Sequence, residues 1–375
     1  MMNYIKKIQL VILIIIVAGI LSSCNKVAIQ ETFSILSYKN EEHYTLFRQS
    51  DFTVGKFLQT PYGFFYKSFN EYLYYSKDGH MKYTKLCGKP DCSHNTKDCN
   101  AYIGISPIGY YNHKLYYFVR NTLFTMNMDG NEHKRVKTLY EGMDGHFGYF
   151  HNGYYYYVIT KGGSIGFSGN DDNNLYAVKV DDSSKPVILL TDDIIKTITM
   201  FNLVGENIYF FNYNLGNFEL YSYSMITKEL MKLGNKWSTY GSCCFDDKFG
   251  YCYFPNEGFY EYDIYDKDLV NVKSVKFEDE GICAAFYYSD YIYLVHYYGE
   301  KPSHENQILY IYDRQYNPVD SINFDKVVGK WSMGGFITDV GDYILYASDF
   351  NDKPDYYIDK SEIGTGELKF HKIED

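Results

Sequence analysis

Three observations predict an all-β fold and, within that class, a β-propeller. The chain of 375 residues contains 44 Tyr and 26 Phe but only two Trp, and these aromatic residues favour strands. Short tyrosine-rich segments recur with a spacing of about 40–45 residues, which is the period of a four-stranded propeller blade. Beyond residue 24 no stretch keeps a helical hydrophobic period, and the strand–helix alternation of a parallel sheet is missing.

The repeating unit is a tyrosine-rich strand, a turn, and a second strand of the form Leu-Tyr-x-Tyr or Leu-Tyr-x-Val. The first strand is expected at 72–75, 115–118, 154–158, 208–211, 251–254, 292–294 and 344–346. The second is expected at 81–83, 123–126, 175–178, 220–223, 259–263, 309–313 and 356–359. Steps of 42, 40, 53, 44, 40 and 53 residues separate the equivalent tyrosines Tyr74, Tyr116, Tyr156, Tyr209, Tyr253, Tyr293 and Tyr346. Seven copies predict seven four-stranded blades, with six or eight as the neighbouring alternatives.

Turns and insertions complete the predicted repeat. Asp78-Gly79 and Asp129-Gly130 suit tight hairpins, where a positive φ is needed. The two long steps imply loop insertions at 161–174 and 295–308. A ring must also close, because an open blade leaves unpaired strand edges, and we expect segment 43–59 to add a strand beside the last blade. Because a tyrosine ring can be buried while its hydroxyl reaches water, we expect many half-exposed strands.

The first 24 residues predict export and a lipid anchor. Lys6 and Lys7 precede an apolar run that ends in Leu21-Ser22-Ser23-Cys24, which is the arrangement of a secretory signal peptide with a small-residue cleavage site. These last four residues resemble the lipobox of bacterial lipoproteins, in which the cysteine is acylated and becomes the first residue of the mature chain. The alternative is an uncleaved anchor, but residues 8–21 number only 14, and a spanning helix needs roughly 20.

The expected organisation is a signal peptide at 1–23, a lipid-anchored linker at 24–43 and a β-propeller domain at 44–375, with a cysteine and histidine loop at 86–102. The leader holds two of the 36 basic side chains and none of the 47 acidic ones, which leaves 34 basic and 47 acidic side chains and a net charge of −13. Such an acidic surface argues against nucleic acid as a partner. The expected location is the outer, extracytoplasmic face of the cell membrane, through an acyl chain on Cys24.

One segment departs from the repeat and predicts a metal site. Cys87, Cys92, His94 and Cys99 have the spacing Cys-x4-Cys-x-His-x4-Cys. Three thiolates and one imidazole are the ligand set of a structural Cys₃His zinc site, and such donors can close a tetrahedron around Zn²⁺. Four protein ligands leave no open position for water or substrate, so the predicted zinc is structural rather than catalytic.

Two alternatives stay open for the same cysteines. In an oxidising compartment, Cys87 or Cys92 could form a disulfide with Cys99 and leave the third thiol free. In an anaerobic habitat all three thiols could instead stay reduced without a metal. Elsewhere, Cys243 or Cys244 could pair with Cys252 across a hairpin, and the residue pattern does not decide between them.

Two resemblances accompany these motifs. Over most of its length the repeat resembles bacterial TolB-like and WD40-like propellers, although the Trp-Asp signature of WD40 repeats is missing. The cysteine segment keeps Leu86, Lys89, Pro90, Ala101 and Tyr102 around the four ligands. In this it resembles a stretch found in uncharacterised surface lipoproteins of anaerobic Firmicutes, particularly gut clostridia. The resemblance implies a Gram-positive surface protein with a propeller and implies no activity.

The favoured functional hypothesis is a non-enzymatic propeller that presents loops and a channel mouth to a protein, peptide or glycan partner. The sequence contains no His-Glu-x-x-His and no Walker loop. A second hypothesis is an extracellular glycan hydrolase or lyase, which would need carboxylates or histidines that converge at the central channel. A third is an accessory or sensory component of a transporter.

Overall fold

The computed structural model describes residues 57–374, apart from 69, 105, 143–144, 161–171, 205–206, 215–216, 238–241, 246–249, 256–260, 266–270, 277–280, 288–290, 299–306, 316, 324–335, 341 and 348–352. The predicted signal peptide, Cys24 and the linker therefore lie outside the described residues. No helix in the described part is long and apolar enough to cross a membrane.

The described residues form 28 strands and two short 3₁₀ helices, η2 (Asp193–Lys196) and η3 (Lys360–Glu362). The first three sheets contain β1 (Phe57–Thr60), β2 (Gly63–Lys67), β3 (Leu73–Ser76), β4 (Thr84–Lys85), β5 (Ile108–Tyr111), β6 (Lys114–Val119), β7 (Thr122–Asn127), β8 (Lys134–Thr138), β9 (Gly145–His151), β10 (Tyr154–Thr160), β11 (Asn174–Lys179) and β12 (Val187–Thr191). The expected all-β class is confirmed.

The remaining four sheets continue the same pattern. They contain β13 (Ile198–Val204), β14 (Asn207–Asn214), β15 (Asn217–Ser224), β16 (Leu230–Trp237), β17 (Ser242–Phe245), β18 (Gly250–Pro255), β19 (Glu261–Tyr265), β20 (Asn271–Lys276), β21 (Gly281–Tyr287), β22 (Ile292–Tyr298), β23 (Gln307–Tyr312), β24 (Pro318–Asn323), β25 (Phe336–Val340), β26 (Tyr343–Ala347), β27 (Tyr356–Asp359) and β28 (His371–Lys372).

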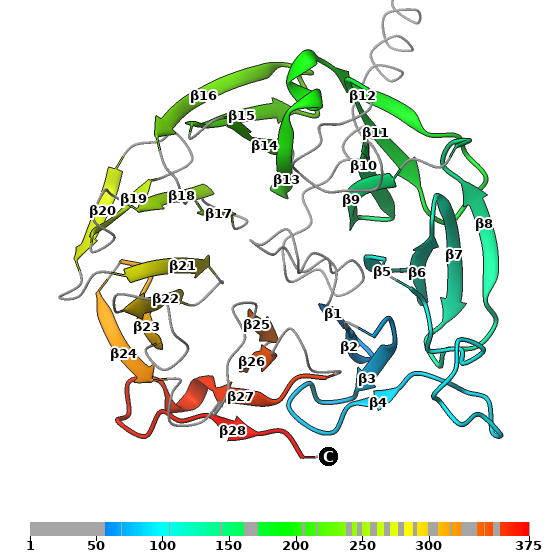
Figure 1. Ribbon diagram of the computed structural model, residues 1–375, viewed down its shortest axis with the longest axis horizontal. Helices are drawn as coiled ribbons and strands as arrows, with labels where there is room; N and C mark the ends of the chain where they lie inside the picture. The colour runs from blue at the N-terminus through cyan, green and yellow to red at the C-terminus, as the bar shows by residue number, and fades with distance from the viewer. Residues whose placement is uncertain are drawn as a thin grey trace, which may run out of the picture.

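The seven four-stranded sheets are arranged around a common centre (Figure 1). Within each sheet neighbouring strands are antiparallel, and the strands follow one another in chain order. The first strand of each sheet lies nearest the centre and the fourth lies at the rim (Figure 1). Short hairpins suffice for such a meander, which explains why turn residues recur along the chain at strand ends.

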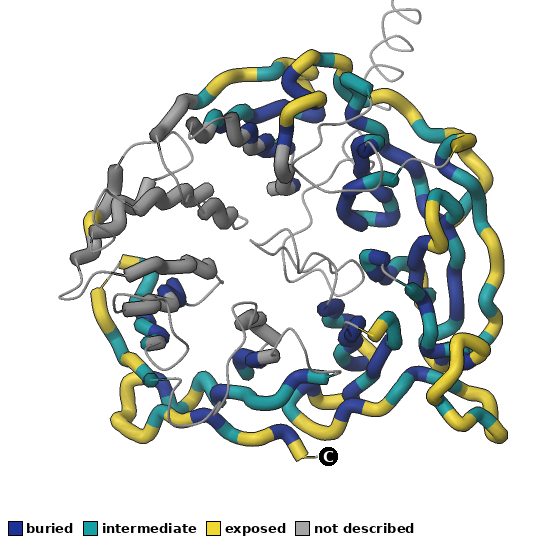
Figure 2. The backbone as a smooth tube through the Cα atoms, viewed as in Figure 1, coloured by how far each residue is buried: buried dark blue, intermediate teal, exposed yellow. Residues whose placement is uncertain are grey.

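The core lies between successive sheets rather than in one central mass. One buried cluster joins the first and second sheets through side chains such as Leu58, Leu73 and Leu115. Others join the second to the third, the third to the fourth and the sixth to the seventh. The outermost strands β8 and β12 are much more exposed than the strands inside them (Figure 2).

The expectation of half-exposed tyrosine strands is wrong for the best-packed sheets. Tyr155 and Tyr156, neighbours on β10, are 0% and 1% exposed. They lie in different clusters, Tyr155 toward the second sheet and Tyr156 toward the fourth. A sheet that is covered on both faces reads as a continuous apolar run instead of an alternating one. Phe57 and Leu58 show the same pattern on β1, since Phe57 packs toward the last sheet and Leu58 toward the second.

The predicted repeat is correct in six units and displaced in the first. Tyr116, Tyr156, Tyr209, Tyr253, Tyr293 and Tyr346 all lie on the second strand of their sheets. Tyr74 lies on the third strand, β3, and segment 81–83 precedes β4 instead of forming a strand. Asp78-Gly79 therefore joins the third and fourth strands, as Asp129-Gly130 does in the next sheet. The two equivalent Asp-Gly turns could have revealed the correct register of the first unit. Its second and third strands are both rich in aromatic residues, however, and this similarity concealed the shift.

Two expectations about loops and closure need correction. Of the 295–308 insertion, residues 295–298 and 307–308 belong to β22 and β23, while the 161–171 part of the other insertion lies outside the described residues. In segment 43–59, residues 43–56 lie outside the described residues, and residues 57–59 start β1 and pair with β2 of the first sheet instead of with the last sheet. The last sheet takes its four strands from β25 to β28. In the described residues the ring is closed by side chains, in a cluster that joins Phe57 and Tyr66 to Leu345 and Ile373.

Candidate metal centre

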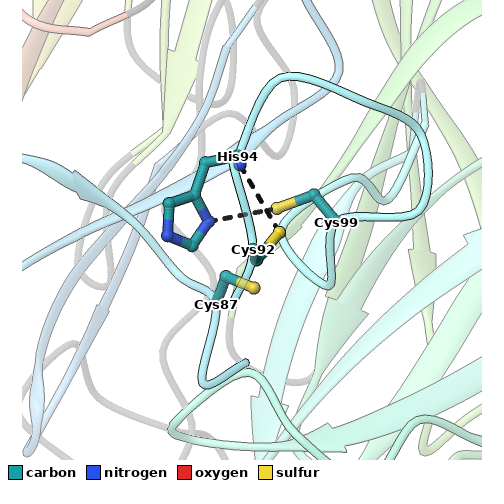
Figure 3. A group of neighbouring side chains, drawn as sticks. All are labelled: Cys87, Cys92, His94 and Cys99. Carbon is teal, nitrogen blue, oxygen red and sulfur yellow. Dashed lines mark hydrogen bonds between the residues drawn. The ribbon is translucent and has the colours of Figure 1, made fainter. Parts of the chain in front are cut away.

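The predicted ligands lie on a loop at the rim of the ring, between β4 and β5 (Figures 1 and 3). Residues 88–91 are exposed, whereas Cys99 near the other end of the loop is only 3% exposed. Pro90 and the polar residues around it cannot continue a strand ladder, which suits a loop that leaves the sheet.

The structure brings all four predicted ligands together. The ligand atoms of Cys87, Cys92, His94 and Cys99 lie within 4.8 Å of one another. Figure 3 shows the three sulfur atoms and the imidazole converging, with Cys99 Sγ 3.6 Å from His94 Nδ1. The backbone N–H of His94 donates to Cys92 Sγ at 3.4 Å, a contact that also orients this sulfur toward the group.

The two thiols at the ends of the loop differ in acidity. Burial acts to raise the pKa of Cys87, but the backbone N–H groups of Lys89 and Asn100 and the neighbouring Cys99 and Cys92 thiols lower it to about 7. For Cys99, burial is the main cause that raises the pKa, to about 11; the backbone N–H of Ala101 acts to lower it, and hydrogen bonds with Cys87 and Cys92 add to the increase. Metal binding needs thiolates, so a metal that enters the group must displace the Cys99 proton.

Two lysine side chains hold the loop by donating hydrogen bonds to its backbone carbonyls. The Lys85 ammonium donates to the His94 carbonyl at 2.6 Å and lies 3.8 Å from the centre of the Tyr72 ring. Within the loop, Lys89 donates to the Asp98 carbonyl at 2.6 Å. His94 itself has a φ of 55°, a left-handed conformation that is uncommon for a residue with a side chain. These contacts fix the backbone that carries the imidazole.

A second set of contacts braces the loop against the neighbouring sheet. The Asn100 side-chain amide donates to Asn131 Oδ1 at 3.1 Å, and Asn131 Nδ2 donates to Asp129 Oδ2 at 3.0 Å. Gly88 lies so close to the Asn131 side chain that a Cβ at position 88 would be 2.1 Å from Asn131 Nδ2. Sequence reasoning missed Asn131 and Asp129, because only the packing of two sheets brings the β7–β8 turn to the loop.

The donor set and its spacing fit a metal ion. Metal–sulfur bonds of about 2.3 Å in a tetrahedron imply edges of about 3.8 Å between ligand atoms, so a group already within 4.8 Å needs only a small contraction. The four donors would complete the coordination shell. Cys87, Cys92 and Cys99 are free thiols in this structure, and the disulfide alternative remains a prediction that the structure does not test.

The other predicted cysteines are placed only in part. Cys24 lies outside the described residues. The β17–β18 register sets Cys243 directly opposite Cys252, and Cys244 opposite Tyr251.

The centre of the ring offers few acidic groups on its strands. Of the innermost strands β1, β5, β9, β13, β17, β21 and β25, only β25 contains a carboxylate, Asp339. On β9, His146 lies beside the Tyr155 hydroxyl and the Arg120 carbonyl, at 2.8 and 2.9 Å, and burial lowers its pKa to about 4. A neutral histidine held at both ring nitrogens is a packing element in this sheet.

One motif escaped the sequence reasoning. Residues 162–166 read Gly-Gly-Ser-Ile-Gly and match the letters of Gly-x-Ser-x-Gly. The motif acts as a nucleophile elbow only on a strand-to-helix turn, and these residues lie outside the described part.

Comparisons with known proteins support the fold and not an activity. No protein-family model and no curated protein matches the chain. Among solved structures, an oligogalacturonate lyase in complex with manganese matches at a TM-score of 0.53 and 13% identity, over 84% of this chain and 89% of the lyase. A prolyl endopeptidase matches at 0.52 and 12%, over 93% of this chain and 52% of the peptidase, so this chain spans about half that enzyme's length.

A TolB protein from Agrobacterium tumefaciens also matches, at a TM-score of 0.35 and 12% identity, over 56% of this chain and 76% of TolB. This TM-score is too low to indicate a shared fold. The fold is of the propeller type, as the lyase and peptidase matches indicate. At such identities the likeness establishes the fold alone.

Proposed function

We propose that this chain is a lipid-anchored extracellular protein whose seven sheets are the blades of a propeller, and that the propeller binds a protein, peptide or glycan without catalysis. The observation that carries the proposal is the small number of carboxylates on the innermost strands of the described part. Across the seven innermost strands in the described part, one carboxylate is present. Glycoside hydrolysis of the common type needs two that flank the bond.

The Cys₃His group also supports a function without catalysis, because its ligands suit a structural metal. We propose Zn²⁺ as its metal, because three thiolates and one imidazole are typical ligands of structural zinc. A shell of four protein ligands has no free position at which substrate or water could bind. The metal would therefore order the loop instead of taking part in a reaction.

Lipid attachment at Cys24 is the part of the proposal that rests on sequence alone. The charged start, the apolar run and Leu21-Ser22-Ser23-Cys24 support export, cleavage and acylation. Attachment would place the acidic domain outside the membrane on a linker of 24–43. A Gram-positive surface is the setting proposed from the resemblance of the cysteine segment.

A second candidate function is a lyase for acidic glycans. Its support is the match to the oligogalacturonate lyase, which covers most of both chains at the level of fold. The candidate would require further carboxylates from loops, because Asp339 is the one carboxylate on the innermost strands of the described part.

One experiment separates the two candidates. The full chain, purified in detergent, is screened on an array of glycans and peptides, and each ligand that binds is then incubated with the protein and tested for breakdown products. Saturable binding without turnover supports the binding module. Release of unsaturated oligosaccharides from polygalacturonate would overturn it in favour of the lyase.

A further inference from the structure

The outer strand of the first sheet is interrupted at the position opposite Leu73 of β3. The Leu73 carbonyl accepts from the Leu86 N–H at 2.8 Å, while the Leu73 N–H donates to the Ala101 carbonyl at 2.7 Å. In a regular antiparallel ladder a single residue would make both of these bonds. Here the two bonds come from residues on either side of the Cys/His loop, so Leu86 and Ala101 share one position in the ladder.

The ladder continues in register beyond this point. Before the break, Thr84 and Lys85 pair with Tyr75 and Tyr74. After it, Tyr102 forms a bridge with Tyr72, and the Ile103 N–H donates to the Glu71 carbonyl at 3.0 Å. Opposite Tyr75, Tyr74, Leu73, Tyr72 and Glu71 of the partner segment, the outer strand therefore places residues 84, 85, 86, 102 and 103 in turn. Ala101 shares the position of Leu86, opposite Leu73.

Side-chain burial follows the same joined strand. Leu86 and Ile103 are 7% and 2% exposed and belong to one cluster between the first and second sheets. Lys85 and Tyr102, the residues that alternate with them, are half-buried. This is the alternation of a single strand with one face in the core. Neither half gains its register from the loop, because both halves pair with the same partner strand.

We infer that residues 87–101 are an insertion in an otherwise complete outer strand, and that bound metal orders this insertion and not the propeller. The inference about metal rests on the zinc site proposed above, whereas the insertion itself rests on the ladder. Cys87 and Cys99 lie near the two ends of the inserted loop, so a metal bound by both would hold these two ends together. Insertions at a strand edge are tolerated when the loop ends already lie together.

The insertion carries an exposed surface whose shape the metal would control. An open pocket lies on the loop and is lined by Lys89, Pro90, Asp91, Cys92, Ser93, Thr96 and Asp98. Every one of these residues belongs to the insertion, so the shape of the pocket follows the conformation of the loop. Metal loss would therefore change a surface at the rim while the sheets stay folded, which is a local opening rather than global unfolding.

The test is removal of residues 87–101 from the full chain, which joins Leu86 directly to Tyr102. We expect the variant to keep the circular dichroism of the parent, to melt within about 3 °C of it, and to bind no zinc. In the parent, a chelator should increase amide hydrogen exchange in residues 87–101, with little change in the seven sheets.

A second variant, His94→Ala, keeps the whole loop and removes one ligand. An unfolded deletion variant beside a folded His94→Ala variant would overturn the inference, because the loop would then be part of the fold. Increased exchange across distant sheets such as β13–β16 after chelation would overturn it as well. Absence of zinc from the parent would contradict the proposed metal but would leave the deletion experiment to decide the insertion.

Discussion

His80 of the first sheet stacks on Tyr343 of the last, with ring centroids 3.9 Å apart and an interplanar angle of 26°. Tyr357 meets the same imidazole edge-on at 5.3 Å. His80 follows the β3–β4 turn residue Gly79, while Tyr343 and Tyr357 lie on β26 and β27. The two ends of the described chain thus meet through rings, next to the buried cluster that joins the same sheets.

This contact predicts that His80 contributes to closure of the ring. His80→Ala should lower the free energy of unfolding by about 1 kcal/mol, which is typical of an aromatic pair. His80→Phe keeps a ring in the stack and should recover most of the loss. Urea unfolding of the two variants and the parent measures the difference. Equal destabilisation by Ala and Phe would show that stacking is not the stabilising contact.

The second prediction concerns the metal. The purified chain should contain one zinc ion, and His94→Ala should lose it while the three thiols of the loop remain. Elemental analysis with thiol titration under denaturing conditions makes the measurement. A chain that lacks zinc and has two fewer titratable thiols would instead support the disulfide alternative, which His94→Ala would leave unchanged.

The third prediction tests the brace between the loop and the second sheet. Gly88→Ala would place a Cβ 2.1 Å from Asn131 Nδ2, so the Asn131 side chain would have to move and lose its hydrogen bond to Asn100, at a cost of about 1 kcal/mol. We expect zinc binding to weaken about tenfold, measured by competition with a chromophoric chelator. Asn131→Ala removes the obstacle together with its hydrogen bond to Asn100, so the double variant should bind more tightly than Gly88→Ala alone. Additive losses would show that the two residues act independently.

The fourth prediction is a pH dependence from His146. Burial holds its pKa at about 4 in the folded chain, against about 6.5 when unfolded. The unfolded chain therefore binds a proton more readily, and this group's contribution to stability is complete above pH 6.5 and is lost as the pH falls toward 4. His146→Gln removes the titration but keeps hydrogen-bonding groups. Between pH 7.5 and 5 the parent should lose on the order of 1–2 kcal/mol more than this variant; equal losses would contradict the assignment.

The fifth prediction concerns Cys24. Cys24→Ser in the full chain should abolish incorporation of a labelled fatty acid and leave an uncleaved leader. Fractionation and mass spectrometry of the N-terminus give the readout, and Cys252→Ser, a change remote from the leader, is the control. Labelling of the Cys24→Ser variant would place the acyl chain elsewhere or show that the signal is adventitious.

Local patterns predicted much of this fold. Six of the seven tyrosines taken as equivalent lie on the second strand of a sheet, because strand, turn and strand are neighbours in sequence and depend on short-range chemistry. The first unit was displaced because its strands resemble one another, and register depends on which strand finds which partner. The four candidate ligands were also predictable, since their types and spacing lie within 13 consecutive residues.

Residue types and their spacing were enough to predict the all-β class, the spacing of the strands and the four candidate ligands Cys87, Cys92, His94 and Cys99. The burial of both faces of β10, the contact of Asn131 with Gly88 and the stacking of His80 on Tyr343 depend on how the sheets assemble. The interruption of the outer strand opposite Leu73 also depends on that assembly. The reason is physical: a strand's own residues set its propensity, but burial and pairing depend on which distant segments the ring brings against it.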